Sequence, residues 1–96
     1  MIYATLDYKG EFERQHRLLH KILANNFAEV QEGLQCDSWI SVQENGEEVW
    51  VDSFTSMKHE VKAKVRNSEL AIKVIKVLEK MYDVTVHDPP EFEGHE

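Results

Sequence analysis

The 96-residue chain contains one cysteine, two prolines and no long apolar run. Its single cysteine, Cys36, excludes an intrachain disulfide. No apolar stretch approaches the roughly 20 residues that a membrane-spanning helix needs, and the first residues, MIYATLDYKGEF, lack the basic and apolar regions of a secretory signal. These absences favour a cytoplasmic protein without membrane contact, and the length favours a single domain.

Basic residues are also scarce, with 11 Lys and Arg against 18 Asp and Glu, a formal net charge of −7. Residues 1–57 carry four basic against ten acidic side chains, residues 58–80 seven against three, and residues 81–96 none against five. The excess negative charge argues against direct binding to nucleic acid and permits a basic protein partner. The acidic end of the chain could lie back on the basic segment 58–80, or both could be solvated.

Hydrophobic periodicity predicts the elements. Alternating apolar and polar residues predict strands, and apolar residues three and four apart predict amphipathic helices. We expect strands within residues 2–8, 27–36, both halves of 38–54, 57–65 and 82–87, and helices within 11–26 and 68–81. In residues 27–36 the apolar side chains are sparse, and Gly33 suggests a bulge or bend. Val65 and Met81 are expected to point inward.

The order β-α-β-β-β-β-α-β predicts an α+β fold: a mainly antiparallel sheet of five or six strands with two helices packed on one face. A split βαβ unit with extra central strands is one such topology. We expect the domain to span residues 1–88, with 89–96 as an acidic tail, because Pro89-Pro90 should end regular structure.

The clearest local signal is the stretch SWISVQENGEEVWVDSF, which predicts a hairpin with a two-residue type I′ turn at Asn45-Gly46. Such a turn fixes the register. The expected cross-strand pairs are Gln43 with Glu48, Val42 with Val49, Ser41 with Trp50, Ile40 with Val51 and Trp39 with Asp52. One side of this ribbon is then aliphatic, and the other carries the two tryptophans.

The tryptophan side of the hairpin is the main candidate site, an interaction surface formed by Trp39, Trp50, Glu48 and Asp52. Large aromatic side chains on an uncovered sheet face mark partner surfaces. Alternatively, a lysine of the next strand (Lys58, Lys62 or Lys64) covers the indoles and makes cation–π contacts with them.

Other candidate sites are incomplete. His16 and His20 have the four-residue spacing that lets two imidazoles meet one metal ion, but no third ligand is evident, and boundary histidines in contact with solvent explain both. Cys36 has no recognisable base, and a lone cysteine is more often a small buried hydrophobe. We therefore predict no catalytic residue, no cofactor and no metal. Metal binding by His16 and His20, or by the end of the chain, stays open.

The end of the chain, HDPPEFEGHE, combines imidazoles with carboxylates. Such a set could hold a divalent ion, but ordering a chain end costs about 1–2 kcal/mol per residue. A solvated or docked acidic tail is the simpler interpretation.

We thus expect a small acidic cytoplasmic protein without enzymatic activity, acting as a protein-interaction or regulatory module through its hairpin face. Self-association as a homodimer is one form of this hypothesis. An acidic inhibitor, an immunity-type protein or a nucleic-acid mimic, each facing a basic partner, is another. A small ligand-binding or metal-binding domain, or an enzyme with an unrecognised site, is the alternative.

Overall fold

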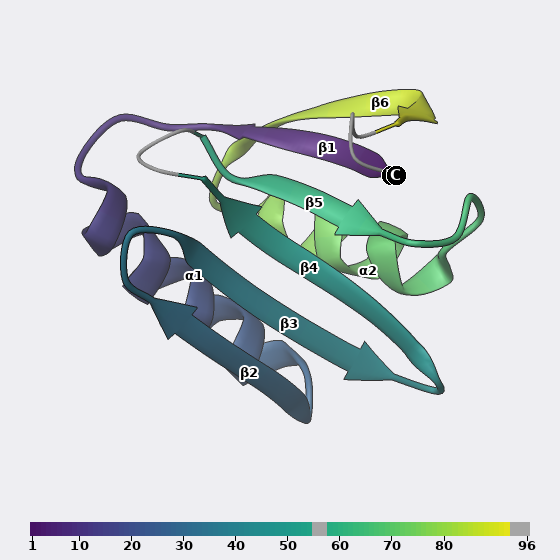
Figure 1. The fold of residues 1–96 in the computed structure, drawn as a ribbon, viewed down its shortest axis with the longest axis horizontal. Coiled ribbons are helices and arrows are strands. Elements are labelled where there is room, and N and C mark those ends of the chain that lie inside the picture. The colour runs from purple at the N-terminus through teal and green to yellow at the C-terminus, as the bar shows by residue number, and fades with distance from the viewer. Residues whose placement is uncertain (55–57, 93–96) are drawn as a thin grey trace.

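The computed structural model describes residues 1–54 and 58–92 of the chain. The chain folds as an α+β domain with the predicted order β-α-β-β-β-β-α-β (Figure 1). Its elements are β1 (Ile2–Asp7), α1 (Phe12–Asn26), β2 (Glu29–Leu34), β3 (Ser38–Glu44), β4 (Glu47–Ser53), β5 (Glu60–Ala63), α2 (Glu69–Leu78) and β6 (Asp83–Glu91). The fold predicted from the sequence is confirmed.

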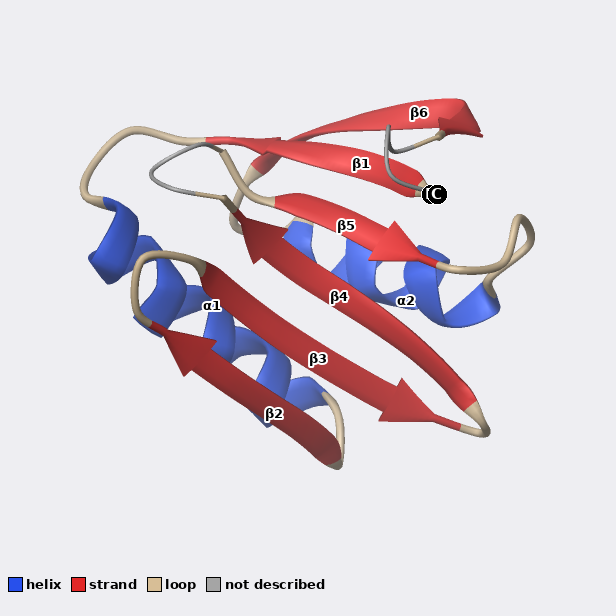
Figure 2. Ribbon diagram, in the orientation of Figure 1, coloured by secondary structure: helices blue, strands red, loops and turns tan. Residues whose placement is uncertain are grey.

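The six strands form one antiparallel sheet in the order β2-β3-β4-β5-β1-β6. Helix α1 connects β1 to β2 and packs on β2 and β3, whereas α2 connects β5 to β6 and packs on β4 and β5. Both helices therefore lie on the same face of the sheet (Figure 2). Among the described elements, no helix covers the other face, which we call the open face.

The β3–β4 hairpin has the register expected from the sequence, and all five predicted cross-strand pairs are present. Asn45 and Gly46 have φ values of 52° and 80°, as a type I′ turn requires. The turn therefore determines which side chains of the hairpin face the helices and which face outward.

The core lies between the helices and the sheet. Buried apolar side chains of β1, β3, β4, β5 and both helices form it, and Val30 of β2 and Val84 of β6 are partly buried against it. The largest fully buried aliphatic side chains are Leu6, Leu19, Leu23, Ile40, Val42, Val49, Val51, Val61, Leu70, Val74 and Leu78. Each contributes about 1.5–3 kcal/mol relative to an exposed position. The Ser68 hydroxyl accepts a hydrogen bond from the backbone N–H of Ala71 and so caps α2.

Three predictions that concern the ends of the elements are wrong. Val65 and Met81 were expected to point inward but are 54% and 61% exposed, because β5 ends at Ala63 and α2 at Leu78. The last strand does not stop before Pro89-Pro90 but continues to Glu91. As an edge strand, β6 can include proline, since no other described strand pairs with its outer N–H groups.

Candidate interaction face

The open face is built by strand alternation from the side chains that point away from α1 and α2. On the four strands β2 to β5 it carries Glu29, Gln31, Gly33, Trp39, Ser41, Gln43, Glu48, Trp50, Asp52, Glu60 and Lys62. All four residues of the predicted interaction surface thus lie on one side of the sheet. The two tryptophans are diagonal neighbours, since Trp39 is paired with Asp52 and Trp50 with Ser41.

Trp39 is 41% exposed and lies against the backbone of Gly33 on the neighbouring strand. A Cβ atom at Gly33 would lie 2.3 Å from the indole Nε1 and 2.6 Å from Cε2. Any other residue at this position would push the indole away. Gly33 does not bend the strand, because it remains in regular register with Trp39. The expectation of a bulge is wrong: the glycine makes room for the indole instead.

Trp50 is half-buried, and a lysine partly covers it. The Lys64 Nζ lies 5.7 Å from the centre of the indole, within cation–π range. The covering lysine considered as an alternative is therefore present at Trp50. The other two lysines of that segment are paired elsewhere, Lys58 with Asp7 and Lys62 with Asp52.

The two carboxylates of the predicted surface are held in place by neighbours. Glu48 Oε2 accepts hydrogen bonds from Ser41 Oγ at 2.6 Å and from Gln43 Nε2 at 3.0 Å. The Ser41 bond and then the Gln43 bond favour the charged carboxylate and hold the pKa of Glu48 below its usual value of 4.5. Asp52 Oδ1 lies 2.9 Å from Lys62 Nζ, which is also 3.8 Å from Glu60.

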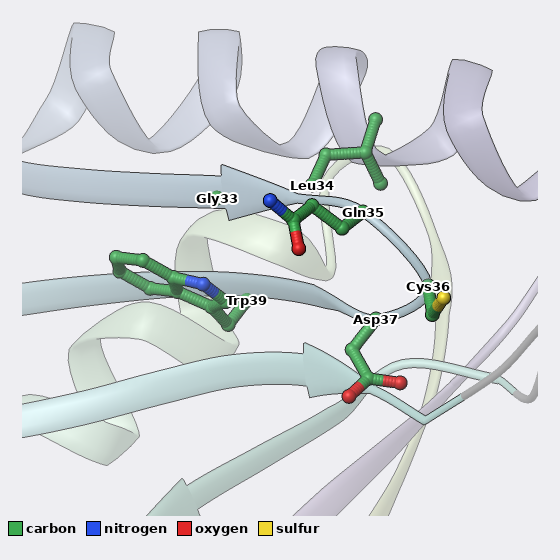
Figure 3. A pocket seen from close by; sticks show the side chains of 6 residues that line it. All are labelled: Gly33, Leu34, Gln35, Cys36, Asp37 and Trp39. Atoms are coloured by element: carbon green, nitrogen blue, oxygen red, sulfur yellow. The ribbon is translucent and has the colours of Figure 1, made fainter.

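A shallow hollow of about 420 Å³ continues this face at the β2–β3 turn. Trp39 and Gly33 line one side of it, and Gln35, Cys36 and Asp37 line the turn (Figure 3). Cys36 is exposed there, so the expectation of a buried cysteine is wrong. The sequence did not predict this hollow, because it depends on where the turn places its side chains.

The predicted histidine pair separates into two environments. His16 is only 2% exposed and uses both ring nitrogens, with Nδ1 2.5 Å from Ser38 Oγ and Nε2 3.1 Å from Glu32 Oε2. His20 is partly exposed. The expectation that His16 is a boundary residue in contact with solvent is wrong. In the described part of the chain, no three His, Cys, Asp or Glu side chains are placed to hold a metal ion.

A buried polar cluster links His16 to a second imidazole that the sequence interpretation overlooked. Ser38 Oγ lies 2.7 Å from His59 Nε2, and His59 Nδ1 lies 2.7 Å from the Tyr8 hydroxyl. Ser38 and His59 have no exposed surface. The alternation of residues 57–65 could have revealed His59, since it has the same parity as the buried Val61 and Ala63.

The candidate ligands at the end of the chain are partly within β6. His87 Nε2 lies 2.9 Å from Thr5 Oγ1, and His87 Nδ1 lies 3.4 Å from Glu91 Oε1. Residues 89–91, which the sequence assigned to the tail, belong to this strand. Of the other candidate ligands, Asp88 also lies in β6, whereas Glu93 and His95 lie outside the described residues.

Comparisons of the chain with protein-family models, with curated proteins and with solved structures found no match. Neither helix of the described chain is long and apolar enough to cross a membrane.

Proposed function

We propose that this protein is a non-enzymatic interaction module that binds a basic protein surface on its open face. The observation that carries the proposal is the pair Trp39 and Trp50 on a sheet face that neither helix covers. Trp39 and Trp50 would be the anchors, and Glu48 and Asp52 would contact cationic groups of the partner.

The anchors are largely preorganised. The Trp39 indole is held against the Gly33 backbone and still exposes 41% of its surface. An aromatic side chain fixed in this way loses little conformational entropy when a partner covers it. Such anchors carry much of the binding energy of protein interfaces.

Charge complementarity supports a basic partner. On strands β2 to β5 the open face carries the carboxylates Glu29, Glu48, Asp52 and Glu60, and Lys62 and Lys64 are the basic groups beside them. Hydrogen bonds from Ser41 and Gln43 favour the negative charge on Glu48. The Lys64 contact with Trp50 is an internal example of the cation–aromatic pairing that a partner's arginine or lysine would make.

The buried cluster supports the non-enzymatic part of the proposal. Ser38 Oγ lies between two imidazole nitrogens, which would suit a nucleophile. However, the Ser38 side chain has no exposed surface, so a substrate cannot reach it in this conformation.

An acidic inhibitor that occupies a basic site on its target would fit the open face best among the expected roles. The exposed Cys36 thiol suits the reducing cytoplasm.

The test compares wild-type protein with the double variant Trp39→Ser/Trp50→Ser in affinity capture from a cytoplasmic extract, followed by direct titration of the purified captured protein. We expect a partner with a net positive surface, bound at least 100-fold more weakly by the double variant, since two anchor residues each contribute about 2 kcal/mol. Glu48→Gln/Asp52→Asn should weaken binding and reduce its salt dependence.

The matched control is Ile72→Ser, which removes an apolar side chain that is 51% exposed on α2, on the opposite side of the molecule. This change should leave binding unaltered. Equal binding by wild type and the tryptophan variant would contradict the proposal. Sedimentation analysis tests whether a second copy of this chain binds the open face. A dimeric wild type together with a monomeric tryptophan variant would identify that second copy, in place of a basic partner.

A further inference from the structure

Five side chains from different parts of the fold form a continuous hydrogen-bonded chain. It runs from the Tyr8 hydroxyl to His59, Ser38, His16 and the Glu32 carboxylate, with donor–acceptor distances of 2.7, 2.7, 2.5 and 3.1 Å. Its three central members are buried, and the Glu32 side chain is 37% exposed at its end. These hydrogen bonds thus connect the residue after β1, the segment before β5, β3, α1 and β2.

Counting protons shows that this chain has one direction. Each of the four bonds needs one hydrogen between its two heavy atoms. Neutral Tyr8, His59, Ser38 and His16 supply one each, and a charged Glu32 supplies none. Because the carboxylate can only accept, His16 Nε2–H must donate to it. Ser38 then donates to His16 Nδ1, His59 Nε2–H donates to Ser38, and Tyr8 donates to His59 Nδ1.

An additional proton fits this chain without the loss of any bond. If His16 is protonated at both nitrogens, Nδ1–H donates to Ser38, so the Ser38 hydroxyl must turn toward His59 Nε2. His59 then carries its hydrogen on Nδ1 and donates to the Tyr8 oxygen. The Tyr8 hydroxyl hydrogen becomes free to point away from the chain. Three of the four bonds reverse and the fourth, to Glu32, becomes an ion pair.

We propose that this chain is a buried proton-binding site that stores one proton on His16 against Glu32 and relays its presence to Tyr8 through Ser38 and His59. Its ligand is the proton itself, and its output is a change of donor direction at Tyr8, at the far end of the chain from Glu32. This inference does not depend on the open face or on a partner.

The neighbouring groups determine where the proton is held. His16 faces the Glu32 carboxylate from β2, the Ser38 hydroxyl from β3 and the His59 imidazole from the segment before β5. Burial, and then repulsion from His16, lower the pKa of His59 to about 4, which makes His59 the poorer place for a positive charge. The Glu32 carboxylate, 3.1 Å from His16, favours the charge there instead.

The groups that surround His59 and Tyr8, at the end of the hydrogen-bonded series away from Glu32, are uncharged. Phe12 stacks on His59 with ring centres 5.8 Å apart. Tyr82 meets Tyr8 edge to face and donates its hydroxyl to Gln15. Burial raises the pKa of Tyr8, and burial followed by repulsion from Tyr8 raises that of Tyr82 to about 12. Both phenols therefore stay protonated as the pH is lowered, and Tyr8 responds only by turning its hydroxyl.

The test is nitrogen-15 NMR of the histidine rings of the intact protein as the pH is lowered. We expect His16 to change from a ring with one protonated nitrogen, Nε2, to a ring with two. In the same titration step His59 should remain neutral but move its hydrogen from Nε2 to Nδ1. A His59 that keeps its hydrogen on Nε2 while His16 becomes charged would overturn the proposal. So would a His16 that never takes up a proton while the protein is folded.

Two variants provide independent evidence. Glu32→Gln removes the carboxylate 3.1 Å from His16 Nε2, so His16 should take up its second proton only in a more acidic solution than in the wild type. Ser38→Ala should uncouple the rings, so that His59 no longer changes with His16, whereas Ser38→Thr should preserve the coupling. A tautomer change of His59 that persists in a folded Ser38→Ala protein would contradict the relay. If Ser38→Ala does not fold, the Glu32→Gln result decides, and an unchanged uptake pH would contradict the site.

Discussion

The indole of Trp39 occupies the space above Gly33 that a Cβ atom would otherwise fill. Gly33 on β2 and Trp39 on β3 are cross-strand partners, and the missing side chain at Gly33 allows the indole to lie against the backbone of the edge strand. Gly33 therefore determines where the indole of Trp39, the more exposed of the two tryptophans on the open face, can lie. A glycine in a strand often marks such a close approach.

Gly33→Ala should displace the Trp39 indole, since the added methyl would lie 2.3 Å from Nε1. We expect a loss of about 1–3 kcal/mol in the free energy of unfolding, the usual cost of forcing an additional carbon into a filled space. Tryptophan fluorescence and urea titration measure the two effects. Gln31→Ala, on the same strand and face, is the matched control and should change neither. An unaltered Gly33→Ala protein would mean that the indole is not held by this contact.

The hairpin and the two helices were predictable because their determinants are local. The Asn45-Gly46 turn fixes the register of β3 on β4, and that register alone places both tryptophans on the same side. The buried cluster was not predictable in the same way. Ser38 and His59 meet only because the sheet order brings β3 and the start of β5 to the same end of the core.

Local rules failed where a tertiary contact changed the meaning of a residue. Gly33 suggests a bulge or bend when only its own strand is considered, but the residue that explains it lies on the next strand. His16 was placed at the margin of the α1 stripe, but its polar partners Ser38 and Glu32 allow the imidazole to be buried there. In both cases the sequence contained the residue, and only the packing revealed its role.

Ser41→Ala should raise the pKa of Glu48 toward its ordinary value. The Ser41 hydrogen bond is the main cause of the lowered pKa, and the Gln43 bond is the second. Carbon-13 NMR of the Glu48 carboxyl group as a function of pH measures the shift. Gln43→Ala should produce a smaller rise in the same direction, whereas Gln31→Ala should produce none. A Glu48 that titrates identically in wild type and Ser41→Ala would show that the carboxylate is not held by this hydroxyl.

Gly46→Ala should destabilise the protein by about 1–2 kcal/mol, the cost of a left-handed conformation for a residue with a Cβ. Gly46 has a φ of 80°, and apart from its chain neighbours no atom of the described residues lies within 4 Å of the added carbon, so the loss comes from backbone strain. Urea titration provides the measurement. Asn45→Gly is the control: Asn45 also has positive φ, and glycine adopts it freely, so the loss should be small. A larger loss for Asn45→Gly than for Gly46→Ala would contradict this account of the turn.

The stability of the fold should fall as the solution becomes acidic, in part because His59 resists protonation. Its pKa is about 4 in the folded protein, lowered by burial and by His16, against an ordinary value of 6.5. Below pH 6.5 the unfolded chain therefore binds a proton that the folded protein does not. The contribution of neutral His59 to the free energy of unfolding is fully present above pH 6.5. It is smaller by about 2 kcal/mol at pH 5 and by about 3 kcal/mol at pH 4, at 1.36 kcal/mol per pKa unit.

His59→Gln isolates this contribution, because the amide keeps a donor and an acceptor but does not titrate. The variant should be less stable than wild type at pH 7.5, and the difference should narrow by about 2 kcal/mol when urea titrations are repeated at pH 5, because only wild type loses the His59 contribution. Gln31→Ala, a change at an exposed residue that does not titrate, should follow the wild-type profile closely. Parallel profiles for wild type and His59→Gln would show that His59 has nearly the same proton affinity in the folded and unfolded states.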